Sequence, residues 1–132
     1  APNLPHIRTV YDQLVQVMLN LILNALDATV EGAGMEITTE LLPETVAGPA
    51  RIGIHIVDEG HGIPMEAQEK VFQPYYTTKD HGTGLGLFVC RQLTHHALGG
   101  EIRLVKSTSQ GTEFFVTLPA NTATDGSSEA KF

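Results

Sequence analysis

The sequence predicts an α+β fold, a two-layer α/β sandwich in which a mixed, mostly antiparallel sheet is covered by helices on one face. Two segments with helical patterning are each followed by a pair of candidate strands, and the first of these pairs alternates apolar and polar residues. Strands that come in pairs, rather than strictly alternating with helices, favour this architecture. A long irregular stretch, 60–82, separates the two halves, and loops of this length are usually functional.

The first half begins with residues 4–10, a candidate edge strand, followed by a helix from Asp12 as N-cap to about Thr29. Five polar residues of this helix fall within about 80° of one another, and the other positions are nearly all apolar. We therefore expect a helix that is buried around most of its girth, with one polar stripe facing a polar ligand. The stripe comprises Gln13, Gln16, Asn20, Asn24 and Asp27.

Alternation predicts strands at 35–42 and 52–58, joined by a loop at 43–50. In the second half, an apolar run over 85–98 predicts a helix, and strands are expected at 101–106 and 113–118. The Thr/Ser/Gly-rich segment 120–132 is expected to be a disordered tail or linker, which leaves one domain over 1–119.

Bulk composition excludes several classes of protein. The chain has 132 residues, 42% hydrophobic and 17% charged, which is typical of a soluble globular domain. Its net charge of −7 argues against binding to nucleic acid or to an anionic membrane. No run reaches the roughly 18 apolar residues of a membrane span. The single Cys90 fits a reducing compartment and is expected to be a small apolar residue of its helix.

Glycines at alternate positions lie at the N-terminus of the second predicted helix: Gly82, Gly84 and Gly86. Unpaired N–H groups and the helix dipole favour phosphate at such a helix start. Upstream, Asp58 ends a strand just before Gly60 and Gly62. A carboxylate there can accept a hydrogen bond from an exocyclic amine while the glycines admit a flat ring, although the same pattern also occurs in ordinary turns.

Asn20 and Asn24 lie one helical turn apart on the same face. An amide oxygen is a suitable neutral ligand for Mg²⁺, which also binds phosphate oxygens. The alternative is that both amides bond to the backbone inside the core.

Residues 72–79 carry Phe72, Tyr75 and Tyr76 beside Lys79. This pattern indicates a hydrophobic anchor for a lid, with Lys79 reaching phosphate, or else a satellite apolar cluster with a solvated lysine. The six histidines are expected to be structural or at the surface, with only His81 placed to contact phosphate.

Taken in order, these segments resemble the catalytic, ATP-binding domain of sensor histidine kinases of the GHKL superfamily. Residues 13–28 resemble its N box, 58–62 the first glycine box, 72–79 the F box, 82–87 the second glycine box and 111–114 the last short motif. The resemblance covers residues 4–119 and is closest to kinases of the nitrogen- and dicarboxylate-sensing type. It implies the Bergerat sandwich with a long ATP lid.

The resemblance also implies residue roles. Asn24 would hold Mg²⁺, and Lys79 would contact the terminal phosphates. Asp58 would accept a hydrogen bond from the adenine amine, with Thr112 in the same hydrogen-bond shell. The catalytic residues would be Lys79 and Asn20. The full ATP-binding set would be Asn24, Asp27, Asp58, Gly60, Gly62, Ile63, Tyr76, Thr77, Thr78, Lys79, Gly82, Thr83, Gly84, Leu85, Gly86, Leu87 and Thr112.

Two positions depart from the family pattern. Asp27 occupies the position where many of these kinases carry a lysine. More of the negative charge of the phosphates would therefore have to be neutralised by Lys79 and Mg²⁺. Residues 95–98 lengthen the segment before Gly99-Gly100, which leaves the end of that helix open.

Asn20 also separates the candidate activities. Hydrolytic members of the superfamily place a general-base Glu at this position, and an amide cannot take a proton at neutral pH. The resemblance therefore implies transfer of the ATP γ-phosphoryl group to a histidine on a separate dimerisation domain of the same kinase, with a response regulator downstream. We expect the isolated domain to be monomeric and to be the cytoplasmic portion of a kinase. A hydrolytic ATPase, a serine-directed kinase of the anti-sigma-factor type and a degenerate binding module remain the alternatives.

Overall fold

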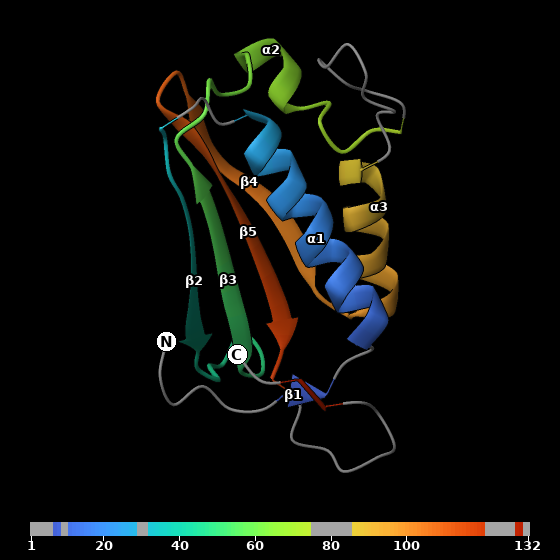
Figure 1. The fold of residues 1–132 in the computed structure, drawn as a ribbon. Coiled ribbons are helices and arrows are strands. Elements are labelled where there is room, and N and C mark those ends of the chain that lie inside the picture. The colour runs from blue at the N-terminus through green and yellow to red at the C-terminus, as the bar shows by residue number, and fades with distance from the viewer. Residues whose placement is uncertain (1–6, 9–10, 29–31, 75–85, 121–128, 131–132) are drawn as a thin grey trace.

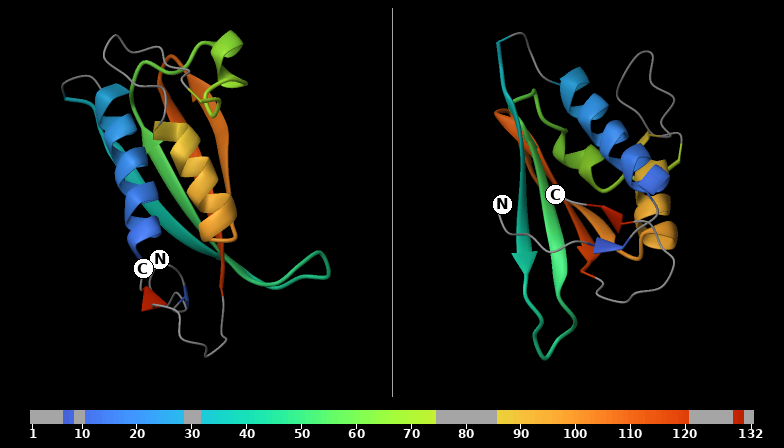
Figure 2. Two further views of the ribbon diagram at one scale, coloured as in Figure 1. Left: turned by 90° about the vertical axis from the view of Figure 1, so that its right-hand side faces the viewer. Right: turned by 60° about the horizontal axis from the view of Figure 1, so that its bottom comes forward.

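A computed structural model of the chain describes residues 7–8, 11–28, 32–74, 86–120 and 129–130. A four-stranded antiparallel sheet in the order β2-β3-β5-β4 forms one layer. Its strands are β2 (Met35–Leu42), β3 (Arg51–Asp58), β4 (Glu101–Thr108) and β5 (Gly111–Pro119). Helices α1 (Tyr11–Ala28) and α3 (Gly86–Gln92) pack side by side on one face (Figures 1 and 2). The predicted α+β sandwich is confirmed.

The core lies between the helices and the two central strands. Ile52, Ile54 and Ile56 of β3 alternate toward the helices, and their partners on β5 do the same. Helix α1 contributes side chains at i, i+3 and i+4 spacing, which places them on one face of the helix. The buried residues of α1 are Leu14, Val17, Leu21 and Ala25.

The expectation that α1 is buried around most of its girth is wrong. Val15, Leu19, Leu23 and Leu26 are 43–54% exposed, and their spacing of four, four and three residues places them in one stripe. A helix in a two-layer sandwich meets the sheet and its neighbouring helix on one side only, so the opposite apolar stripe stays at the surface.

Short elements differ from the sequence-based expectations. Strand β1 (Ile7–Arg8) pairs with β6 (Glu129–Ala130) in a separate two-stranded sheet, instead of extending an edge of the main sheet. β6 lies within the segment expected to be a tail or linker; residues 121–128 of that segment lie outside the described residues. Helix α2 (Met65–Gln68) interrupts the long irregular segment.

The second predicted helix is divided, because α3 is followed by a π-helical turn, η1 (Leu93–Ala97). The Leu98 N–H donates to the Leu93 carbonyl at 3.0 Å, an i to i−5 bond. The Thr94 hydroxyl donates to the Cys90 carbonyl at 2.6 Å. A π-helical turn takes up an additional residue in a helix, which explains the lengthened segment before Gly99.

None of the helices among the described residues combines the length and the apolar composition needed to cross a bilayer.

Candidate functional site

Several elements end together at one end of the molecule. The C-terminal ends of α1 and β3, the first turn of α3 and the short α2 gather there (Figure 1). On the sheet, Asp58 at the end of β3 lies directly opposite Thr112 on β5, and both are buried on the helix side, at 3% and 4% exposure. A carboxylate and a hydroxyl are thus held side by side at the edge of the core.

The loop after Asp58 is tied to that carboxylate. The Gly60 N–H donates to Asp58 Oδ1 at 2.8 Å, which fixes the side chain in an Asx-type turn. A carboxylate has two acceptor oxygens, so this bond leaves capacity for a ligand amine. The geometry fits the role that the family resemblance implies for Asp58.

Two glycines permit close backbone approach around this pair. Gly62 has φ +81°, and a Cβ there would lie 2.0 Å from the Thr108 carbonyl oxygen. Gly111 has φ +148°, and its Cβ would lie 2.0 Å from the Asp58 carbonyl oxygen. Both positions therefore require glycine, on conformational and on steric grounds.

A hydrogen-bond network next to Thr112 involves two residues that the sequence reasoning missed. The Ser107 Oγ lies 2.7 Å from the Thr112 Oγ1 and accepts the Ile63 N–H at 2.7 Å. The Gln68 amide on α2 donates to the Ile63 carbonyl at 3.0 Å and to the Ser107 carbonyl at 3.4 Å. The only local signal for Ser107 was the Ser/Thr-rich composition around the β4–β5 turn, and Gln68 on α2 had none.

The polar stripe of α1 lies beside α3. The Gln16 amide donates to the Asn20 Oδ1 at 3.0 Å, and the Asn20 side chain also bonds to Cys90 of α3. Asn24 is half-buried one turn further on, and Asp27 is exposed near the end of the helix. The stripe therefore runs toward the end of the molecule that carries Asp58. Among the described residues, no three His, Cys, Asp or Glu side chains gather as a metal site.

The start of the predicted lid is anchored on the core. The Phe72 ring packs edge-on against Phe114 at a centroid distance of 6.0 Å, and the Arg91 guanidinium lies 5.7 Å from its centre. These contacts fit both interpretations of Phe72, as an anchor for a lid and as a member of a satellite apolar cluster.

The second glycine box lies mostly beyond the described residues. Gly86 and Leu87 form the first turn of α3, and Leu87 packs against the core. The remaining predicted site residues lie outside the described part of the chain: Tyr76, Thr77, Thr78, Lys79, Gly82, Thr83, Gly84 and Leu85. Tyr75 and His81 lie outside it as well.

Other polar residues near the site have local structural contacts. Glu59 accepts the Gly34 N–H at 3.1 Å and thereby ties the start of β2 to the end of β3. The His61 ring bonds to the Gly62 carbonyl at 2.8 Å. On the uncovered face of the sheet, His55 lies between Glu40 and Glu113 and stacks on Phe115. For His55, these contacts agree with the structural role expected from the sequence.

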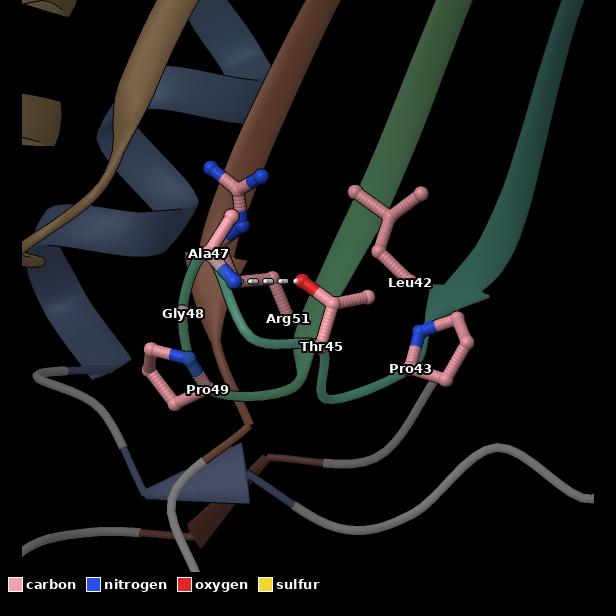
Figure 3. A pocket seen from close by; sticks show the side chains of 7 residues that line it. All are labelled: Leu42, Pro43, Thr45, Ala47, Gly48, Pro49 and Arg51. Atoms are coloured by element: carbon pink, nitrogen blue, oxygen red, sulfur yellow. Dashed lines mark hydrogen bonds between the residues drawn. The ribbon is translucent and has the colours of Figure 1, made fainter.

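A hollow at the β2–β3 turn lies at the far end of β3 from Asp58 (Figures 1 and 3). The Ala47 N–H donates to the Thr45 hydroxyl at 3.1 Å and closes this turn. The hollow is lined by Leu42, Pro43, Thr45, Ala47, Gly48, Pro49 and Arg51. No residue that the sequence predicted for the site lies there.

Comparison with known proteins places this arrangement in a family. Residues 9–122 match the family described as "Histidine kinase-, DNA gyrase B-, and HSP90-like ATPase". The chain is 38% identical to the sensor histidine kinase ZraS of Escherichia coli O157:H7 over 119 residues, which are 90% of this chain and 24% of ZraS. It therefore spans about a quarter of the length of that relative.

Solved structures agree. The catalytic domain of histidine kinase ThkA superposes with a TM-score of 0.74 at 32% identity, over 86% of this chain and 71% of that one. Full-length ShkA in complex with AMPPNP superposes with a TM-score of 0.68 at 30% identity, over 86% and 22% of the two chains. The chain belongs to the histidine kinase-, DNA gyrase B- and HSP90-like ATPase family, and its fold is that of a histidine kinase catalytic domain.

Proposed function

We propose that this domain binds ATP with Mg²⁺ and donates the γ-phosphoryl group to a histidine on a separate dimerisation domain of the same kinase. The observation that carries the proposal is the buried Asp58–Thr112 pair, flanked by Gly62 in the loop after β3 and by Gly111 at the start of β5, neither of which has room for a side chain. The ShkA structure was determined with AMPPNP, an ATP analogue, which supports nucleotide binding by this chain.

The residues of the chain divide the work of binding. Asp58 would accept a hydrogen bond from the adenine amine. The backbone N–H groups of the second glycine box, 82–87, would donate hydrogen bonds to phosphate at the start of α3. Asn24 would hold Mg²⁺, which neutralises phosphate charge when bound, and Lys79 would contact the terminal phosphates. Phosphoryl transfer depends mainly on positioning and electrostatics. These binding residues would therefore support transfer only when an acceptor histidine is held next to the γ-phosphate.

Asn20 favours transfer over hydrolysis. Its amide occupies the position of the general base in hydrolytic relatives and is held by Gln16 and Cys90, so it cannot activate water by taking a proton. We therefore expect little phosphate release by the isolated domain. The acceptor would be a His on the dimerisation domain, whose helices would dock beside Phe72, Tyr75 and Tyr76. A response regulator would take the phosphoryl group next. The expected location is the cytoplasm.

Calorimetric titration with ATP, with and without Mg²⁺, tests this proposal. We expect Mg²⁺-dependent binding that weakens roughly 10- to 100-fold in Asp58→Asn, because a charge-assisted hydrogen bond is lost. The Mg²⁺ dependence should disappear in Asn24→Ala. Asp12→Asn, an exposed change at the opposite end of α1, is the matched control and should bind as the unaltered protein does.

The same samples distinguish the alternatives. Steady phosphate release without a partner would favour a hydrolytic ATPase. Absence of ATP binding by the unaltered domain would contradict the proposal.

A further inference from the structure

The Ser107 hydroxyl lies in the middle of a chain of hydrogen bonds. It accepts the Ile63 N–H at 2.7 Å and lies 2.7 Å from the Thr112 hydroxyl. A hydroxyl that accepts one hydrogen bond is polarised to donate its own proton, so aligned bonds strengthen one another. The favoured direction runs from Ile63 to Ser107 and on to Thr112. Thr112 then keeps its own proton to donate to a ligand.

The Ser107 position is fixed from both sides. The Gln68 amide bonds to the carbonyl oxygens of both Ile63 and Ser107, which holds the two partners of the first hydrogen bond together. The missing Cβ of Gly62 allows the loop to pass against the Thr108 carbonyl. Ser107 therefore has little freedom to turn its hydroxyl away from Thr112.

Asp58 and Thr112 then present opposite hydrogen-bonding characters side by side. The Asp58 carboxylate accepts, and the Thr112 hydroxyl donates. On the edge of adenine, an amine donor stands beside a ring-nitrogen acceptor, which matches this pair. Hypoxanthine and guanine present a carbonyl acceptor beside an N–H donor at the same two positions, which opposes both protein groups.

We infer that Ser107 is a positioning residue that fixes the proton direction of Thr112 and thereby makes the site select adenine over 6-oxopurine nucleotides. This inference rests on the proposed ATP-binding function and adds a specificity determinant to it. Without the Ser107 hydroxyl, the Thr112 hydroxyl can rotate and accept a hydrogen bond as well as donate one. The loss of binding affinity for a base that carries a ring N–H donor then becomes smaller.

The test compares the dissociation constants of ATP and inosine triphosphate, both with Mg²⁺, by calorimetry. Inosine triphosphate differs from ATP only in the atoms that Asp58 and Thr112 would contact. We expect Ser107→Ala to reduce the ratio of the two constants about tenfold, the size of one hydrogen bond. Ser107→Thr keeps the hydroxyl and should retain the ratio. Ser109→Ala, an exposed serine in the same turn, is the matched control.

A double-mutant cycle separates positioning from general stabilisation. In a Thr112→Val background, Ser107→Ala should leave the ratio unchanged, because Ser107 acts through Thr112. If Ser107→Ala leaves the ratio of the two dissociation constants unchanged, including the case in which it weakens binding of both nucleotides equally, the inference is overturned while the proposed ATP binding stands. If the unaltered domain binds neither nucleotide, the proposed function fails and the inference fails with it. Thermal unfolding of each variant verifies that the fold is retained.

Discussion

Among single residues, Cys90 combines complete burial with an ionisable side chain. Its side chain is fully buried between α1 and α3, and its thiol donates to the Val17 carbonyl at 3.6 Å. Burial raises the pKa of the Cys90 thiol to about 12 from 9.0, and the bond from Asn20 offsets part of that rise. The thiolate is therefore absent at neutral pH, and the residue packs as a small apolar group, as the sequence predicted.

The raised pKa of Cys90 makes stability depend on alkaline pH. Above about pH 9 the unfolded thiol loses its proton while the folded thiol keeps it, so the unfolded state is favoured as pH rises. This contribution should lower the free energy of unfolding by about 1.4 kcal/mol per pH unit between about pH 9 and 12. Urea unfolding of the unaltered protein and of Cys90→Ala at pH 8, 9 and 10 gives the free energy of unfolding of each protein. The difference between the two pH profiles is the contribution of Cys90. Parallel pH profiles for the two proteins would contradict this assignment.

Among the elements, α1 carries leucines in two very different environments. Leu21 is 1% exposed and packs in the core, whereas Leu23, two residues later, is 49% exposed. We expect Leu21→Ala to cost about 2–5 kcal/mol in the free energy of unfolding, because it leaves a cavity. Leu23→Ala should change it by less than about 0.5 kcal/mol. Chemical denaturation measures both, and similar losses in the two variants would mean that the outer stripe is also packed.

These two leucines show which part of the fold could not be predicted from the sequence: the main elements were, but the buried face of α1 was not. Alternation predicted β2 and β3. In β3 the alternating isoleucines face the core, as Ile52 does, whereas β2 lies at the sheet edge and its Ile37 and Leu41 are 40% and 46% exposed. The composition of α1 could not reveal which of its apolar residues face the sheet, since the periodic signal is blurred when both sides are apolar. Helix α2 has only four residues, too few to produce a period.

The candidate site divides in the same way. Asp58, Gly62 and Thr112 were predictable because their motifs are local in the sequence. Ser107 and Gln68 were not, since they act through hydrogen bonds to residues 44 and 39 positions away. A single polar side chain near the end of a strand or in a one-turn helix has no sequence pattern that identifies such a distant partner. Three-dimensional contacts are required to find it.

At the scale of the whole molecule, the buried core of the described residues lies entirely before the C-terminal segment. Its buried members run from Leu14 to Leu118, and the Ala120 N–H bonds to the Ala50 carbonyl at 3.0 Å. Beyond this point, the contact described is the two-residue pairing of β6 with β1. Two paired residues per strand provide little stability on their own. The predicted domain boundary near residue 119 can therefore be tested directly by truncation.

We expect a chain that ends at Ala120 to unfold within about 1 kcal/mol of the full chain and to bind ATP with the same affinity, because the buried core side chains that the structure describes all precede this point. A chain that ends at Thr117 is the control. It lacks Leu118, which is 1% exposed and lies opposite Ile52, so it should lose about 2–5 kcal/mol. Chemical denaturation and calorimetry measure both quantities. If the chain ending at Ala120 were as unstable as the control, the domain would extend through β6, and the pairing of the two chain ends would be part of its fold.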